Sequence, residues 1–138
     1  MKKARGQSWI DNGRVAVLIP TVNRAEMLLD RALPSVFAQT HNELDVYVLA
    51  HGCTDNTVEQ VLNRRLLGTG GKQLYLVEVA RRASYPATAE NHWLVGPTDP
   101  LNDGLARVGK AAWIARIDDD DVWAPNHVEC LLSHARWN

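Results

Sequence analysis

The chain has few cysteines, no long apolar run and no excess of charge of either sign. Its 2 cysteines, Cys53 and Cys130, match no zinc-ligand spacing and are too few for a disulfide framework, which favours a reducing cytoplasm. Its apolar runs, such as residues 15–19, are far shorter than the ~20 residues of a membrane-spanning helix. No apolar core follows the basic first residues, so no signal peptide is expected.

The near-neutral charge excludes a broadly basic protein. Lys and Arg total 15 while Asp and Glu total 16, which gives a formal net charge of -1. A wide basic surface for nucleic acid is therefore not expected. A hydrophobic fraction of 46% in 138 residues is enough for the core of one domain, so disorder is not expected either.

Short apolar runs alternate with helical patterns along the chain. Continuous apolar runs predict strands, buried on both faces, at residues 15–19, 44–49, 74–79 and 111–117. Apolar residues at helical spacing predict helices at residues 24–39, 54–67, 101–108 and 125–137. Pro34 is expected to kink or split the first helix, and Thr54 or Asp55 to cap the second. Residues 81–100 contain three prolines and a glycine and are expected to be less regular.

This alternation predicts an α/β fold with a mainly parallel, Rossmann-like sheet flanked by helices. Residues 1–13 are expected to be a polar leader and residues 14–138 the domain. Right-handed crossovers bring the carboxyl ends of parallel strands to one edge, outside which ligands bind. The candidate site residues are therefore expected in residues 20–24, 50–55 and 118–121.

Four consecutive aspartates, Asp118–Asp121, follow the last predicted strand. Their mutual repulsion must be offset by solvent, by a basic neighbour or by a cation, and Mg²⁺ or Mn²⁺ prefers carboxylate oxygens. In an extended chain Asp118 and Asp120 share one side, and Asp119 and Asp121 the other. That spacing predicts an Asp-x-Asp metal site. An acidic surface loop or a helix N-terminal turn is the alternative interpretation.

Five segments in succession resemble the family 2 glycosyltransferases, which have the GT-A fold. They cover most of residues 15–129 and end in the family's Asp-x-Asp-Asp-x-Trp metal motif. The segments are Val-Leu-Ile-Pro-Thr-Val-Asn-Arg (17–24), Leu-Pro-Ser-Val-Phe-Ala-Gln-Thr (33–40), Gly-Cys-Thr-Asp-Asn-Thr (52–57), Asn-Asp-Gly-Leu (102–105) and Ile-Asp-Asp-Asp-Asp-Val-Trp (117–123).

The resemblance implies transfer, with inversion, of a sugar from a nucleotide-diphosphate donor with the help of Mn²⁺ or Mg²⁺. It implies Asp120 as the first metal ligand, Asp121 as the second, and Asp118 at the metal or the ribose. Asn102 is expected on a loop near the sugar or diphosphate. The other implied donor-binding residues are Pro20, Thr21, Asn23, Arg24, Glu26 and Asp119.

The main departure from the family lies after the second predicted strand. The family usually has two aspartates there, and this chain has Ala50 and His51. Alanine cannot accept a hydrogen bond from a nucleobase, whereas a neutral histidine can accept one or stack on the base. The resemblance therefore does not determine which nucleobase is recognised, and a base other than uracil becomes more plausible. His51 is the candidate residue for contacting the base. Three tryptophans, Trp93, Trp113 and Trp123, are expected to pack rather than to bind sugar, with Trp123 nearest the site.

The family's general base and acceptor-binding elements lie in a second half of the domain, so a donor-binding half is expected here and no catalytic base is assigned. The acceptor (glycan, lipid or protein), peripheral membrane association and a homo-oligomer stay open. One alternative is a nucleotide-binding module without transferase activity. Another is a nucleotidyltransferase, which the absence of glycine from residues 21–24 disfavours.

Overall fold

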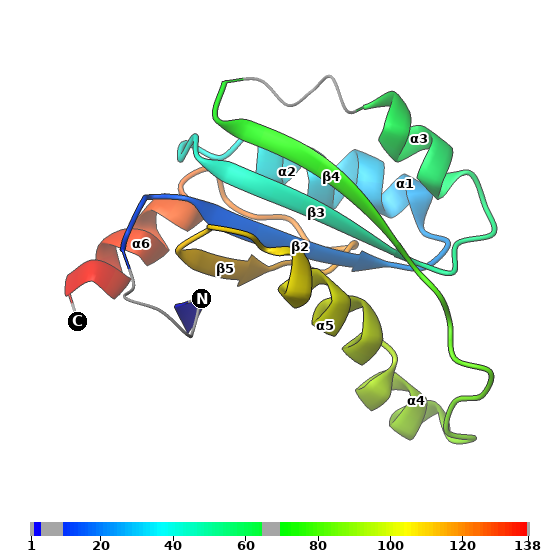
Figure 1. The fold of residues 1–138 in the computed structure, drawn as a ribbon. Coiled ribbons are helices and arrows are strands. Elements are labelled where there is room, and N and C mark those ends of the chain that lie inside the picture. The colour runs from blue at the N-terminus through cyan, green and yellow to red at the C-terminus, as the bar shows by residue number, and fades with distance from the viewer. Residues whose placement is uncertain (1, 4–9, 65–69, 138) are drawn as a thin grey trace.

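The centre of the fold is a single twisted sheet (Figure 1). The computed structural model describes residues 2–3, 10–64 and 70–137. Within them the sheet has 5 strands in the order β1-β5-β2-β3-β4, of which β2, β3, β4 and β5 are parallel and β1 is antiparallel to β5. The predicted α/β fold with a mainly parallel sheet is confirmed. The strands are β1 (Lys2–Lys3), β2 (Val15–Thr21), β3 (Leu44–His51), β4 (Lys72–Val79) and β5 (Trp113–Arg116).

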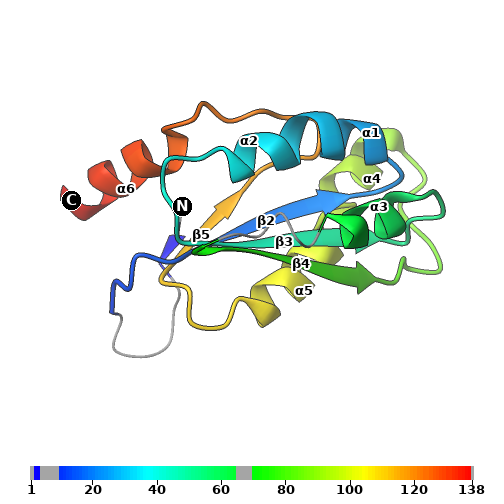
Figure 2. The same ribbon diagram turned by 90° about the horizontal axis from the view of Figure 1, so that it is seen from above.

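Helices cover both faces of the sheet (Figure 2). One face carries α1 (Ala25–Met27), η1 (Leu28–Ala32), α2 (Leu33–Phe37), α3 (Thr57–Asn63) and α6 (His127–Trp137). The other face carries α5 (Thr98–Arg107), with α4 (Ala89–Val95) beyond it. Among the described residues, no helix has the length and apolar character needed to cross a membrane.

Alternate side chains of β2 contribute to two separate cores, because successive residues of a strand point to opposite faces. Val15, Val17 and Ile19 pack with the helices η1, α2, α3 and α6. Ala16 and Leu18 pack on the α5 side. All five residues are at most 2% exposed. Burial on both faces explains why this strand is a continuous apolar run rather than an alternating one.

Pro34 divides the first predicted helix into α, π and α segments. A proline has no N–H to donate to the carbonyl one turn before it. The chain adapts by widening the preceding turn, and the Leu33 N–H bonds the carbonyl of Leu28, five residues back, in the π-helical pattern. The α-helical pattern then resumes, and the Ala38 N–H bonds the Pro34 carbonyl at 2.9 Å. The helix is thus interrupted but not ended.

The expectation of irregular structure over residues 81–100 is wrong for its second half, which holds α4 and the start of α5. The prolines responsible for that expectation lie where a helix tolerates them. Pro97 is the N-cap of α5 and Pro100 lies in its first turn, where the N–H has no partner within the helix. Gly96 separates the two helices.

The other element boundaries differ by a few residues. Helix α3 begins at Thr57 and is preceded by Asn56 rather than capped by Thr54 or Asp55, although the Asp55 carboxylate accepts a 3.0 Å bond from the Thr57 N–H. The predicted end of this helix, at residues 65–67, lies outside the described residues. Strand β5 is shorter than predicted, and Lys2–Lys3 of the predicted leader pairs with it.

The strand order places a topological switch point between β2 and β5. From β2 the chain builds outward through β3 to β4, then returns by way of α4 and α5 to add β5 on the other side of β2. The connections change face at this point, because the helices that follow β2 and β3 lie on one face of the sheet, whereas α4 and α5, which lead to β5, lie on the other, and a crevice is left at the carboxyl edge. Ligands of open α/β sheets bind in this position.

Candidate donor-binding site

A cavity of about 540 Å³ occupies this crevice. It collects residues from the ends of β2, β3 and β5 and closes against α4 and α5. Six of the donor-site residues expected from the sequence, together with the first expected metal ligand, line it. The lining is Pro20, Thr21, Val22, Arg24, His51, His92, Trp93, Gly96, Pro97, Pro100, Arg116, Asp118, Asp119 and Asp120.

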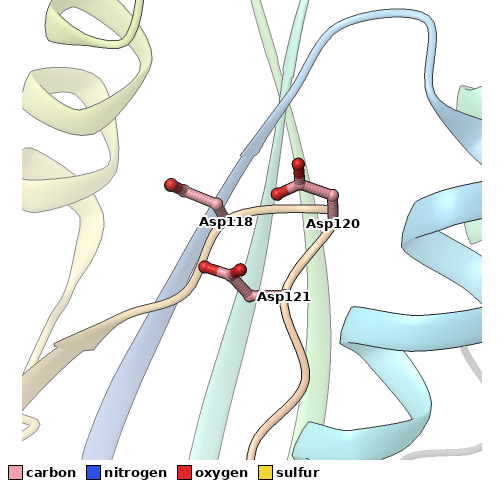
Figure 3. Close-up of side chains that lie close together, drawn as sticks. All are labelled: Asp118, Asp120 and Asp121. Carbon is pink, nitrogen blue, oxygen red and sulfur yellow. The ribbon is translucent and has the colours of Figure 1, made fainter.

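The four aspartates form a tight turn rather than an extended segment. The Asp121 N–H bonds the Asp118 carbonyl at 3.1 Å, which is the hydrogen bond of a β-turn. Asp118, Asp120 and Asp121 therefore point to a common region, with one carboxylate oxygen of each within 4.8 Å of the others (Figure 3). The expected grouping of Asp118 with Asp120 is present. The segment is a turn rather than an extended chain, and the turn brings Asp121 to the same group instead of to the side of Asp119.

Asp119 is the aspartate that turns inward, and it is buried. Its carboxylate accepts a 2.8 Å hydrogen bond from the Thr21 hydroxyl and lies 3.3 Å from the Arg24 guanidinium. Burial raises the pKa of Asp119, while the Thr21 hydrogen bond and the Arg24 charge act in the opposite direction. The carboxylate thus joins the loop after β5 to the end of β2 beneath the cavity.

Two arginines supply positive charge beside the aspartates. Arg24 bridges Asp119 and, at 3.5 Å, Asp120. Arg116, the last residue of β5, donates from Nε and Nη2 to Oδ1 of Asp118 at 3.2 and 2.9 Å. Both arginines line the cavity and are about half exposed, with side-chain exposures of 57% and 48%. The cavity therefore presents anionic and cationic groups side by side.

His51, which stands where the family usually has aspartate, is 2% exposed at the end of β3. Its Nε2 lies 3.0 Å from the Tyr85 hydroxyl. Burial lowers the pKa of His51, and the nearby positive charges of Arg81 and Arg82 lower it further, while the Asp99 carboxylate acts in the opposite direction; the net shift favours the neutral ring. Tyr85 stacks on His92 of α4, with ring centroids 4.7 Å apart. Residues after β4 thus close over the position of His51.

Three expected donor-site residues lie outside the lining. Asn23 holds the neighbouring loop, because its Oδ1 accepts from the N–H groups of Thr54 and Asp55 at 2.7 and 3.1 Å. Its φ of 50° is in the left-handed region, which asparagine tolerates well. Glu26 is exposed on α1. Asn102 lies within α5 instead of on a loop, a correction that follows from the earlier start of this helix.

Trp93 is the cavity residue whose role was wrongly predicted. It was expected to pack, yet it is 77% exposed on α4 and lines the cavity. Trp113 is buried as expected, and Trp123 is half-buried against the main core. Trp123 also lines a second cavity of about 240 Å³ beside Asp118 and Asp121.

Two features of the site gave weak sequence signals. The helix at residues 89–95 was not predicted, because prolines flank it in the sequence. The positions of His92 and Trp93 on this helix were therefore not predicted either. Gln39 is a buried side chain that accepts from the Val128 N–H at 3.0 Å and donates to the Ala124 carbonyl at 2.7 Å. It fixes the segment after the aspartates to the end of α2. The sequence indicated Gln39 only through its place in segment 33–40, which resembles the family.

The exposed carboxylates of Asp118, Asp120 and Asp121 fit a hard divalent cation. Oxygen ligands of one Mg²⁺ lie about 2.1 Å from it and so at most about 4.2 Å from one another. The three carboxylate oxygens lie within 4.8 Å of one another, so small side-chain rotations would bring them to the distances of a shared cation. Asp118 and Asp120 line the 540 Å³ cavity and Asp121 lines the smaller cavity beside it, which leaves room for ligands from a bound molecule.

Comparison with known proteins finds relatives that are similar in sequence over most of this chain. The succinoglycan biosynthesis protein ExoW of Rhizobium meliloti (strain 1021) is 29% identical over 116 residues, which are 83% of this chain and 32% of ExoW. An uncharacterized glycosyltransferase of Nostoc sp. is 28% identical over 119 residues, 86% of this chain and 32% of that protein. The chain thus spans about a third of the length of these relatives.

Solved structures share the fold. TarS 1–349 of S. aureus, in complex with UDP, has a TM-score of 0.66 at 21% identity, over 90% of this chain and 32% of that one. The mannosyltransferase PcManGT of Pyrobaculum calidifontis, in complex with GDP-Man and Mn²⁺, has a TM-score of 0.60 at 25% identity, over 90% and 32%. The family model described as Glycosyl transferase family 2 matches residues 16–138. The chain belongs to this glycosyltransferase family.

Proposed function

We propose that residues 14–138 form the donor-binding part of a metal-dependent glycosyltransferase. The cavity between the ends of β2 and β5 would hold a nucleotide-diphosphate sugar. The observation that carries this proposal is the lining, which brings Thr21, His51 and the loop of Asp118–Asp120 to one crevice at the switch point. The complexes of related folds with UDP and with GDP-Man and Mn²⁺ support a donor of this class.

The parts of the donor are assigned by chemistry. The nucleoside would lie toward Pro20, Thr21 and His51, where polar groups are surrounded by the apolar ends of strands. Asn23 would act indirectly in this scheme, through the loop at Thr54 and Asp55 that its side chain holds. Glu26 lies on α1 outside the cavity lining. Asn102 lies in α5 outside the cavity lining, so we propose no contact between it and the donor.

The diphosphate would lie toward Arg24, Arg116 and the aspartates. Asp120, Asp118 and Asp121 would hold Mn²⁺ or Mg²⁺ there, and the cation would neutralise the diphosphate as a Lewis acid when bound. Asp119, by contrast, is committed to Thr21 and Arg24 and serves to position the loop. The cavity thus separates a base-recognising end from a phosphate-binding end.

The transfer reaction also needs a general base and an acceptor. Transfer with inversion needs a general base to take the acceptor proton. We assign none among the described residues and place it in the two thirds of the relatives' length that this chain does not match. The acceptor would be a glycan, lipid or protein. The two free cysteines, of which Cys130 is exposed, favour a cytoplasmic setting for this chemistry.

Thermal unfolding tests the donor site. The chain is melted with UDP, GDP, CDP and dTDP, each with and without Mn²⁺. A ligand at about 100 times its Kd stabilises the native state by ~2.7 kcal/mol, which raises the Tm by several degrees in a domain of this size. We expect such a rise with at least one nucleotide, and only when Mn²⁺ is present.

Two variants make the test specific. Asp120→Ala is expected to abolish the metal-dependent rise in Tm. Asp30→Ala, at an exposed aspartate of η1 outside the cavity, is the matched control and should retain it. If none of the four nucleotides raises the Tm, the proposal is overturned.

Hydrolysis of a nucleotide sugar separates an enzyme from a nucleotide-binding module without transferase activity. The nucleotide that gives the largest rise in Tm determines which sugar donors to assay. Slow release of free sugar that Asp120→Ala abolishes would indicate a catalytic site. Binding without any hydrolysis favours the binding module, the alternative that the replacement of the family's aspartates by Ala50 and His51 supports.

A further inference from the structure

Arg116 and Asp118 form the wall between the two cavities. They are the two residues that the lining of the 540 Å³ cavity shares with that of the 240 Å³ cavity beside Trp123. A ligand entering either cavity therefore meets this ion pair. Asp118 is also one of the three aspartates that fit a cation. The pair thus lies where metal, diphosphate and the second cavity come together.

The geometry of this pair differs from that of two other exposed arginine–aspartate pairs. Arg82 and Arg136 each bond both carboxylate oxygens of their partners, Asp99 and Asp11. Arg116 directs both N–H groups to the single oxygen Oδ1 of Asp118. A fork that meets two oxygens is the stronger arrangement. With about half of each side chain exposed, the Arg116–Asp118 pair is weak and readily exchanged.

The other cavity arginine is held differently. Arg24 contacts Asp119, which is buried, bonded to Thr21 and outside the group that fits a cation. Arg24 also lies 3.5 Å from Asp120, and a cation on the other aspartates would compete with that contact but would leave the contact with Asp119 in place. The guanidinium contacts of Arg116 within the described residues go to Asp118 itself. A cation and Arg116 therefore compete for the same carboxylate.

We propose that Arg116 changes partner during donor binding. Before a divalent cation binds, its guanidinium neutralises Asp118; once the cation takes Asp118, the guanidinium turns to the diphosphate of the donor. This inference rests on the proposed function, because it assumes a nucleotide diphosphate in the larger cavity. Arg116 would thus be a donor-binding residue with opposite effects on two ligands, weakening the binding of the cation and strengthening that of the diphosphate.

Titration calorimetry on Arg116→Gln tests the exchange. Mn²⁺ alone is titrated first, and loss of the competing charge is expected to tighten its binding about fivefold. UDP and GDP are then titrated at saturating Mn²⁺, and loss of one charge-assisted hydrogen bond is expected to weaken nucleotide binding at least about tenfold. A residue that merely supports the fold would not move the two affinities in opposite directions.

Arg107→Gln is the matched control. Arg107 bonds Asp103 at 3.2 Å on the exposed side of α5, outside both cavities, and its removal should leave both affinities unchanged. Arg116→Lys keeps the charge without the fork and is expected to have the Mn²⁺ affinity of the unsubstituted chain with weaker nucleotide binding. It keeps the inference testable if Arg116→Gln does not fold.

The outcomes separate this inference from the proposed function. Failure of the unsubstituted chain to bind UDP or GDP here, together with failure of CDP and dTDP in the thermal test, would overturn both. Nucleotide binding that Arg116→Gln leaves unchanged, or affinities for Mn²⁺ and nucleotide that fall together, would overturn the exchange alone.

Discussion

The Thr21 hydroxyl donates a 2.8 Å hydrogen bond to Oδ2 of Asp119, 98 residues further along the chain. Both side chains are buried, at 2% and 6% exposure. The bond joins the end of β2 to the loop after β5 and so fixes the width of the crevice between them. A change at either residue alters the site as well as the stability of the fold.

Thr21→Val is therefore expected to destabilise the chain. The valine preserves the shape of the side chain but leaves the buried Asp119 carboxylate without its hydroxyl donor, at a cost of about 1–3 kcal/mol in the free energy of unfolding. Urea unfolding at pH 7 measures the loss. Thr98→Val, at an exposed threonine, is the control and should change stability little. Equal effects of the two substitutions would contradict this role for Thr21.

Gln39→Ala tests the connection between α2 and the segment after the aspartates. The substitution leaves the Val128 N–H and the Ala124 carbonyl without the partner that Gln39 supplies. We expect a loss of about 1–3 kcal/mol in the free energy of unfolding, because the Val128 N–H loses its partner, whereas the Ala124 carbonyl still accepts from the His127 N–H at 3.0 Å. Chemical denaturation measures it, with Gln73→Ala, on the exposed side of β4, as the control. A loss no larger than that of the control would show that the contacts contribute little.

His51 is expected to make stability depend on pH. In the unfolded chain His51 titrates near 6.5, whereas its pKa in the folded chain is lowered by burial. As pH falls below about 7, His51 binds a proton in the unfolded state but not in the native state. The free energy of unfolding therefore falls with pH until the pKa of the folded state is passed. The slope should be smaller in His51→Gln. Urea unfolding from pH 8 to pH 5 compares the two, and identical slopes would contradict the assignment.

Trp93 should report nucleotide binding by its fluorescence. Its indole is 77% exposed on the cavity wall, so a bound nucleotide would displace water from it. With Mn²⁺ and the nucleotide that stabilises the chain most, we expect a change in emission that Trp93→Leu largely removes. Trp137→Leu is the control, since Trp137 is 89% exposed but lies outside the cavity. A full change in Trp93→Leu would place the nucleotide elsewhere.

The fold was readable from sequence because its central strands are buried on both faces. Val15–Thr21 and Leu44–His51 must be apolar through most of their length, and a short apolar run has few other interpretations. Helix α4 was missed because Gly96, Pro97 and Pro100 indicate irregular structure unless their places at helix ends are known.

The site was readable in part. The aspartates were found because four in succession are costly, but the turn that joins Asp121 to Asp118 depends on one backbone hydrogen bond that no side-chain pattern indicates. The contact of His51 with Tyr85 joins residues that are 34 positions apart, through a segment without regular spacing. Contacts of this kind depend on how the loops pack, which is not encoded locally.

The switch point also has a consequence for the order of events during synthesis. A growing chain completes β2, β3 and β4 before β5 exists, so one edge of β2 has no parallel neighbour until residues 113–116 emerge. The crevice that we assign to the donor is bounded by β5, so a nascent chain would form this crevice only after β2, β3 and β4 have been synthesised.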